Sequence, residues 1–120
     1  KLNGQIIELN KQIKEMNEIN FKNYEIEVSN YSIKSGSNGG FVKNWVIEIS
    51  NDGKNWIQID ERTNYSELNG SNLIKTFEIQ SKNNKFSQFI RFRHTGEYWV
   101  YSNCLRIHSI EFYGQIKEKI

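Results

Sequence analysis

A chain of 120 residues with a mean hydropathy of −0.71 has room for one hydrophobic core, which excludes a large multidomain arrangement. The net charge of +2, with acidic and basic residues interspersed, is too small for the clustered basic face that a nucleic-acid partner requires. No apolar run approaches the length of a membrane span, and we expect no membrane-surface partner either.

The N-terminal segment, residues 1–20, is predicted to form an amphipathic helix of the coiled-coil type. Its apolar residues recur at alternating spacings of four and three, at Leu2, Ile6, Leu9, Ile13 and Met16. A seam this short is marginal alone and needs a partner surface. Two alternatives stay open: the helix packs on its own domain or connects it to a preceding region, or it makes the chain a homo-oligomer.

From Tyr24 onward the apolar residues follow a period of two, which is typical of half-buried strands. Asp52-Gly53 predicts a tight hairpin turn. A change of apolar phase in the last strand predicts a bulge near Ser109. Short strands at this spacing predict an all-β antiparallel sandwich over residues 24–116. The predicted strands span residues 24–28, 31–34, 45–49, 56–60, 74–79, 89–93 and 105–113.

Strands that reverse direction at each turn deliver their loops alternately to the two ends of a sandwich. Loops 35–44, 61–72 and 95–104 are therefore expected at one end, and turns 51–55 and 81–88 at the other. The first group is longer, richer in glycine and more aromatic. We expect the binding surface at that end, because loops on a rigid scaffold commonly carry function.

Several motifs in this order resemble the coagulation factor 5/8 type C domain, also called the discoidin domain, over residues 24–115. The most specific is the Ser-Asn-Asp-Gly-x-x-Trp hairpin, followed by an Ile-Arg-Phe-Arg strand and a terminal Glu-Phe-Tyr-Gly. The motifs are Tyr31-Ser32-Ile33-Lys34-Ser35, Trp45-Val46-Ile47-Glu48, Ser50-Asn51-Asp52-Gly53-Lys54-Asn55-Trp56, Phe89-Ile90-Arg91-Phe92-Arg93 and Ile110-Glu111-Phe112-Tyr113-Gly114.

The resemblance implies a galactose-binding-like jelly roll of two antiparallel sheets. Members of the family bind carbohydrate, phospholipid or protein through loops at one end and do no chemistry themselves, and the loop 35–44 matches a ligand-contacting spike. The predicted helix takes the place of the family's first strands, so it stays open whether the jelly roll lacks these strands or receives them in trans. Some members hold a structural calcium ion; the early loop that would supply most of its ligands is missing here, and we predict no cofactor.

The candidate ligand-binding residues lie on the loops of the predicted binding end. Tyr98 and Tyr101 are the stronger ligand candidates, because tyrosine commonly stays partly exposed, whereas Trp99 is expected mainly to close the mouth of the barrel. Phe41 is either the tip of the spike or the anchor of its loop, while Trp45 and Trp56 are expected in the core. The full set is Asn38, Phe41, Tyr65, Asn69, His94, Glu97, Tyr98, Trp99, Tyr101 and Asn103.

No catalytic or metal-binding group stands out. His94 and His108 are too few for a metal triad, and Cys104 has no evident base beside it. Arg91, Arg93 and Arg106 alternate with core residues and are expected to pair with carboxylates.

The predicted function is therefore a non-enzymatic module that binds carbohydrate or another ligand through its loops. The alternative is an intracellular protein-interaction or scaffold module that oligomerises through residues 1–20. The single cysteine, without the pair that brackets extracellular family members, favours a cytoplasmic location and leaves an extracellular one open.

Overall fold

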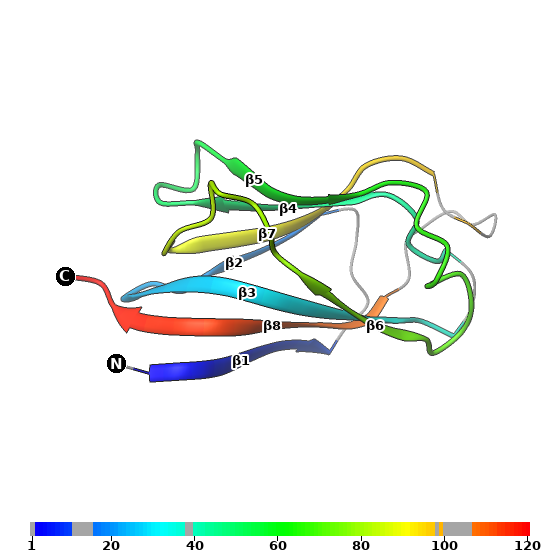
Figure 1. Ribbon diagram of the computed structural model, residues 1–120, viewed down its shortest axis with the longest axis horizontal. Helices are drawn as coiled ribbons and strands as arrows, with labels where there is room; N and C mark the ends of the chain where they lie inside the picture. Colours follow the sequence, from blue (N-terminus) through cyan, green and yellow to red (C-terminus); the bar gives the residue numbers. More distant parts are fainter. Residues whose placement is uncertain (1, 11–15, 38–39, 98, 100–106) are drawn as a thin grey trace.

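The computed structural model describes residues 2–10, 16–37, 40–97, 99 and 107–120. They form two four-stranded sheets packed face to face, and every neighbouring pair of strands is antiparallel (Figure 1). The first sheet has the order β1-β8-β3-β6 and the second β2-β7-β4-β5. The strands are β1 (Leu2–Asn10), β2 (Met16–Asn20), β3 (Tyr24–Ser35), β4 (Trp45–Ser50), β5 (Ile57–Arg62), β6 (Ile74–Glu78), β7 (Phe89–His94) and β8 (Ile107–Glu118). The predicted antiparallel sandwich is confirmed.

The predicted N-terminal helix is wrong. Leu2–Asn10 forms β1 at the edge of β8, and Met16–Asn20 forms β2 at the edge of β7. A single short helix has little to bury its seam against, whereas a strand at each edge satisfies the exposed backbone groups of β8 and β7. The same finding removes the basis for missing first strands and for oligomerisation through a coiled-coil seam. Within the described ranges, no helix is long and apolar enough to cross a membrane.

The core lies between the sheets and is built mainly by the alternating residues of the central strands. Trp45 of β4 is fully buried, with its ring centroid 5.3 Å from that of Phe77 and 6.4 Å from that of Phe92. Tyr31 of β3 stacks on Phe77 at 5.0 Å. Its hydroxyl accepts a 2.9 Å hydrogen bond from Trp45 Nε1 and donates one to Asp60 Oδ2. Burial raises the pKa of Tyr31 far above its usual range, so this hydroxyl stays a donor.

Two irregularities shape the pairing of β3 with β8. The pairing shifts between Val28 and Asn30, so one long strand replaces the two short strands predicted over residues 24–34. A second shift leaves His108 of β8 without a partner in β3, because Lys34 pairs with Ser109 and Ser35 pairs with Ile107. The bulge predicted near Ser109 is therefore confirmed within one residue.

The β4–β5 hairpin closes through the predicted turn. Gly53 has a φ of 74°, a conformation that other residues rarely adopt. The Asp52 carboxylate accepts hydrogen bonds of 2.8 Å from the backbone amides of Asn55 and Lys54, and the Asn55 side chain donates another. These bonds hold the pKa of Asp52 far below its usual range, because they stabilise the charged carboxylate.

An Asp52→Asn variant is expected to be less stable than the parent chain at pH 7, since it cannot offer the turn a charged acceptor. The native carboxylate has the lower pKa, so its contribution is complete above the unfolded-state pKa of about 3.9 and is lost as the pH falls below it. Urea unfolding between pH 7 and pH 2 should show the two chains converging in acid. A stability difference that is the same at every pH would contradict this account.

Strand pairing places the long loops together. At one end Ser35 pairs with Ile107, and Trp45 pairs with both Arg62 and His94. The chain therefore leaves the sandwich at the same end after Ser35, after Arg62 and after His94, as predicted for these three loops. The short turns, the start of β1 and the end of β8 lie at the opposite end (Figure 1).

Candidate functional site

The described loop segments 40–44, 63–73, 95–97 and Trp99 form one hydrogen-bonded surface, named the loop end below. The Tyr65 amide donates to the Lys43 carbonyl at 3.0 Å, and the Thr95 amide donates to the Asn44 carbonyl at 3.0 Å. The Trp99 amide donates to the Phe41 carbonyl at 3.1 Å. Three loops that are distant in sequence are thus fixed to one another by their backbones.

Asn44, which the sequence analysis did not single out, bridges all three loops with its buried side chain. Its Oδ1 accepts the Asn64 amide at 2.9 Å, and its Nδ2 donates to the Glu97 carbonyl at 3.2 Å. A Cβ atom on Gly96 would lie only 3.0 Å from this Nδ2. The glycine therefore lets the third loop approach the first. The only sequence signal was an Asn directly before a strand, which is common in a chain so rich in Asn.

Trp99 is an aromatic residue that hydrogen bonds and a cation hold at the surface of the loop end. Its indole Nε1 donates to the Tyr65 carbonyl at 2.5 Å, and the Lys43 ammonium lies 4.4 Å from the ring centroid. The side chain is half-buried. Trp99 therefore packs against the loops through its indole N–H. Part of its ring stays at the surface, with a cation over one face.

The other described candidates divide into buried supports and exposed groups. Phe41 is only 6% exposed, so it anchors its loop and is not a spike tip. Tyr65 is half-buried and packs edge-on against Trp45 at 5.5 Å, and burial raises its pKa. His94 is buried at the end of β7, whereas Glu97 is exposed.

Asn69 lies on the half of its loop that is tied to β3. Ser35 Oγ donates to the Gly70 carbonyl at 2.6 Å, and the Asn72 amide donates to the Gly36 carbonyl at 3.0 Å. The Asn69 side chain itself is exposed. The remaining candidates, Asn38, Tyr98, Tyr101 and Asn103, lie outside the described residues.

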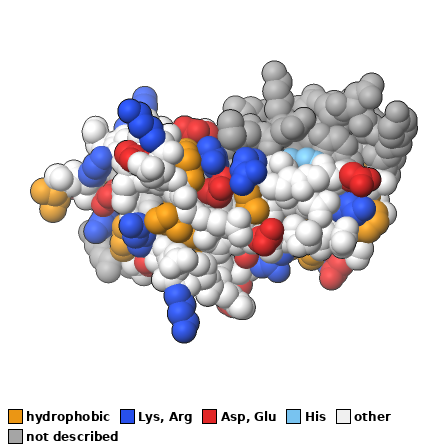
Figure 2. All heavy atoms as spheres, turned by 90° about the horizontal axis from the view of Figure 1, so that it is seen from above, with side chains coloured by type: hydrophobic (Ala, Val, Ile, Leu, Met, Phe, Trp, Pro, Cys, Tyr) orange, Lys and Arg blue, Asp and Glu red, His pale blue; other side chains and the backbone are white. Residues whose placement is uncertain are grey.

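On the outer face of the second sheet, acidic and basic side chains lie next to one another (Figure 2). Glu48 Oε1 accepts hydrogen bonds from Arg91 at 2.7 Å and from Arg93 at 3.1 Å, which confirms the expected carboxylate pairing of both arginines. Burial by itself would raise the pKa of Glu48, but the bonds from Arg93 and Arg91 outweigh it and lower the pKa. Arg106 lies outside the described residues.

Trp45 and Trp56 do not share the predicted place in the core. Trp45 is fully buried, as predicted. Trp56 is half-buried on the outer face of the second sheet, where the Arg91 guanidinium lies 3.9 Å from its ring centroid and Phe89 packs edge-on at 6.3 Å. The prediction for Trp56 is wrong because its partner is a long arginine side chain, which covers a ring from outside the core.

Metal binding finds no support at the described positions. No group of three or more His, Cys, Asp or Glu side chains comes close enough to hold an ion there.

No family model and no curated protein sequence matches the chain. Solved structures do match. The domain described as CpGH89CBM32-6 from Clostridium perfringens is 24% identical, with a TM-score of 0.59 over 91% of this chain and 75% of that one. The family 32 CBM of C. perfringens NanJ, in complex with galactose, is 18% identical, with a TM-score of 0.60 over 90% and 75%. The family 32 carbohydrate-binding module of Streptococcus pneumoniae EndoD is 11% identical, with a TM-score of 0.62 over 83% and 69%.

These likenesses define the class of fold. The chain has the galactose-binding-like, discoidin-type β-sandwich, which confirms the fold that the sequence motifs implied.

Proposed function

We propose that the chain is a non-catalytic carbohydrate-binding module that holds a saccharide at its loop end. The observation that carries this proposal is the likeness of the whole sandwich to carbohydrate-binding modules, including one in complex with galactose and one in complex with GalNAc-β-1,3-galactose. The convergence of the long loops at one end supports the placement of the site.

The loop end offers the kinds of groups that a neutral sugar needs. The partly exposed ring of Trp99 offers an apolar surface for the C–H face of a pyranose. Glu97 and Asn69 are exposed and present a carboxylate and an amide to hydroxyl groups. Lys43 adds an ammonium donor beside the ring. The backbone bonds between the loops hold Trp99 and Lys43 in place before a ligand arrives, which lowers the entropy cost of binding.

The structure does not support the helix on which the scaffold alternative was based. That alternative rested on a helical seam over residues 1–20 and on the missing cysteine pair. The described parts of that segment are strands paired within the two sheets, so the seam does not support it.

A Trp99→Ala variant is expected to bind galactose or GalNAc-β-1,3-galactose about tenfold more weakly, because it loses the stacking surface. Trp99→Phe keeps a ring and should retain most of the affinity. Isothermal titration calorimetry measures both, with circular dichroism to verify folding.

Trp56→Ala is the matched control, since it removes a tryptophan from the outer face of the second sheet, away from the loops. It should leave the affinity unchanged. Equal affinities for the parent chain and Trp99→Ala would reject the loop end as the site. Absence of binding to any mono- or disaccharide in a glycan array would reject the proposed function.

A further inference from the structure

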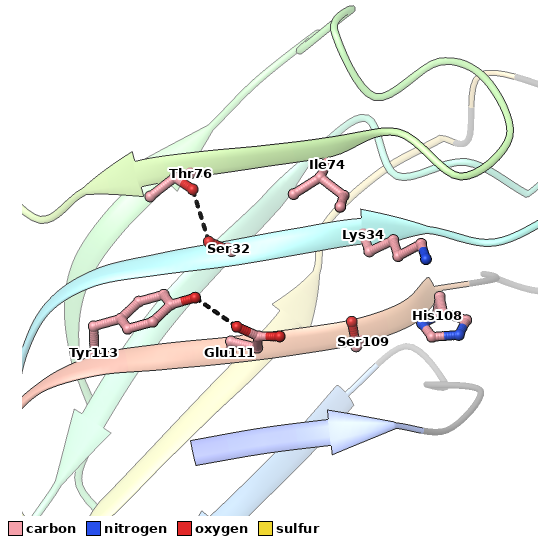
Figure 3. Close-up of a pocket in the computed structure, with 8 residues that line it drawn as sticks. All are labelled: Ser32, Lys34, Ile74, Thr76, His108, Ser109, Glu111 and Tyr113. Atoms are coloured by element: carbon pink, nitrogen blue, oxygen red, sulfur yellow. Dashed lines mark hydrogen bonds between the residues drawn. The ribbon is translucent and has the colours of Figure 1, made fainter. Parts of the chain in front are cut away.

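The outer face of the first sheet carries a groove that is separate from the loop end. It encloses about 390 Å³, within the range of roughly 300–1,000 Å³ that is typical of small-ligand sites. The residues that line it come from β3, β6 and β8 (Figure 3): Ser32, Lys34, Ile74, Thr76, His108, Ser109, Glu111 and Tyr113.

The groove follows from the sizes of side chains in neighbouring rows of the sheet. Ser32 pairs with Thr76 on one side and with Glu111 on the other, and Lys34 pairs with Ile74 and Ser109 in the same way. Short serine and threonine side chains thus form a floor, while longer ones rise around it. The floor is recessed, since Ser32 is only 9% exposed and Ser109 only 7% exposed.

The bulge in β8 adds polar groups to the groove. Regular strands turn consecutive side chains to opposite faces, but the extra residue at His108 lets both His108 and Ser109 line the same hollow. Figure 3 shows His108 beside the end of Lys34, at the end of the groove nearer the loops. The irregularity therefore places two further hydrogen-bonding side chains on one face.

Some polar side chains in the groove already hydrogen-bond to one another, and others have no hydrogen bond to the described residues. Ser32 Oγ and Thr76 Oγ1 share a 2.7 Å hydrogen bond, and the Tyr113 hydroxyl donates to Glu111 Oε2 at 2.5 Å. Figure 3 shows the second oxygen of Glu111 directed along the groove toward Ser109. Across the described part of the chain, no hydrogen bond uses the side chains of Lys34 or Ser109.

The charge of the groove disfavours an anion. Lys34 and Glu111 carry opposite formal charges that cancel, and the carboxylate would repel a phosphate or sulfate group. A peptide strand is disfavoured for another reason. The backbone groups of β3 and β8 are already paired with neighbouring strands, so an extended peptide would find hydrogen-bond partners at a sheet edge and not on this face.

A neutral saccharide carries no negative charge for Glu111 to repel, and it needs no backbone hydrogen bonds from the sheet. Its hydroxyl groups can donate to the free oxygen of Glu111 and accept from Lys34 and Ser109. Ile74, 60% exposed at the rim, offers an apolar surface to a C–H face of the sugar. From Ser109 to Tyr113 the floor runs roughly 13 Å along β8, which suits a short chain of sugar units better than a single one.

We propose that this groove is a second carbohydrate site, which binds a short neutral oligosaccharide across β3, β6 and β8. It uses none of the loop-end residues and does not depend on the proposed function of that end.

The test is a titration of the ¹⁵N-labelled full chain with neutral trisaccharides of galactose, glucose, mannose and xylose. At least one should cause saturable shifts of the backbone amides of Ser32, Thr76 and Ser109. Glu111→Ala should weaken that binding about tenfold or more, because a hydrogen bond to a charged group is lost. Tyr113→Phe, which keeps the ring and removes only the hydroxyl, should weaken it less.

Glu118→Ala is the matched control, since it removes an exposed carboxylate from the far end of the same strand. It should bind as the parent chain does. Groove shifts that persist in Trp99→Ala would separate this site from the loop end. The proposal is overturned if no trisaccharide shifts the groove amides, or if Glu111→Ala and Glu118→Ala bind equally well.

Discussion

A Gly114→Ala variant is expected to lose about 3 kcal/mol or more of its unfolding free energy, the upper part of the range for overpacking. A Cβ atom at this position would lie 2.1 Å from the Glu27 carbonyl oxygen and 2.9 Å from Val28 Cα. Both contacts are with the backbone of β3, which is paired with β6 and β8 and cannot rotate away. Urea unfolding followed by tryptophan fluorescence measures the loss.

Gly70→Ala is the matched control for this substitution. Its Cβ atom would approach Leu73 Cδ1 at 2.9 Å, and that atom is the tip of a side chain that is 39% exposed and can turn aside. We expect a change of less than about 1 kcal/mol. Similar losses in both variants would show that the close approach of β3 to β8 does not limit the fold.

The same glycine shows what the sequence could and could not reveal. Gly114 ended one of the motifs that predicted the discoidin-type fold, yet nothing in the motif explained it. The reason is the neighbouring strand: next to the bulge after Val28, β3 approaches β8 so closely that only glycine fits. A constraint of this kind arises between residues far apart in the sequence, Gly114 and Glu27–Val28, and local sequence patterns do not contain it.

Strands with a long, alternating pattern were predictable, while the first two were not. In β4, Trp45, Ile47 and Ile49 alternate along one face, and the Asp-Gly turn fixes the partner strand. In residues 2–20 the alternating spacing of five apolar residues, by four and by three, is typical of a helix and pointed away from strands. The described residues of this segment form strands because β7 and β8 would otherwise have unpaired edges, and those edges exist only in the assembled sandwich.

The candidate site was predictable as a region but not residue by residue. Counting strand reversals placed the three loops at one end, and the pairing of Trp45 with Arg62 and His94 confirms it. Which side chains support the loops and which face the ligand depends on contacts between the loops. Phe41 is therefore an anchor, one of the two roles that the sequence left open, and Asn44 is a bridge, a role that the sequence did not indicate.

The groove was hidden for a different reason. Ser32, Lys34, Ser109 and Glu111 alternate with core residues, and that alternation is the ordinary pattern of a solvated sheet face. Only the cross-strand register brings the short side chains together as a floor.

A Trp45→Ala variant is expected to lose about 3–5 kcal/mol, a large part of the stability of a domain this size. Removal of this fully buried side chain leaves a cavity bordered by Tyr65, Phe77 and Phe92. The Tyr31 hydroxyl also loses the hydrogen bond that Trp45 Nε1 donates to it. Thermal and urea unfolding measure the loss.

The comparison with Trp56→Ala makes this prediction specific to the core. Trp56 belongs to the same hairpin but is half-buried on the outer face, where it contacts Arg91 and Phe89, so its removal should cost about 1–2 kcal/mol. Because the Tyr65 ring rests on Trp45 and the Tyr65 carbonyl holds the Trp99 indole, Trp45→Ala should also loosen the loop end and weaken saccharide binding. Comparable losses of stability in both variants, or a Trp45→Ala chain that binds as tightly as its parent, would contradict this coupling of core and loops.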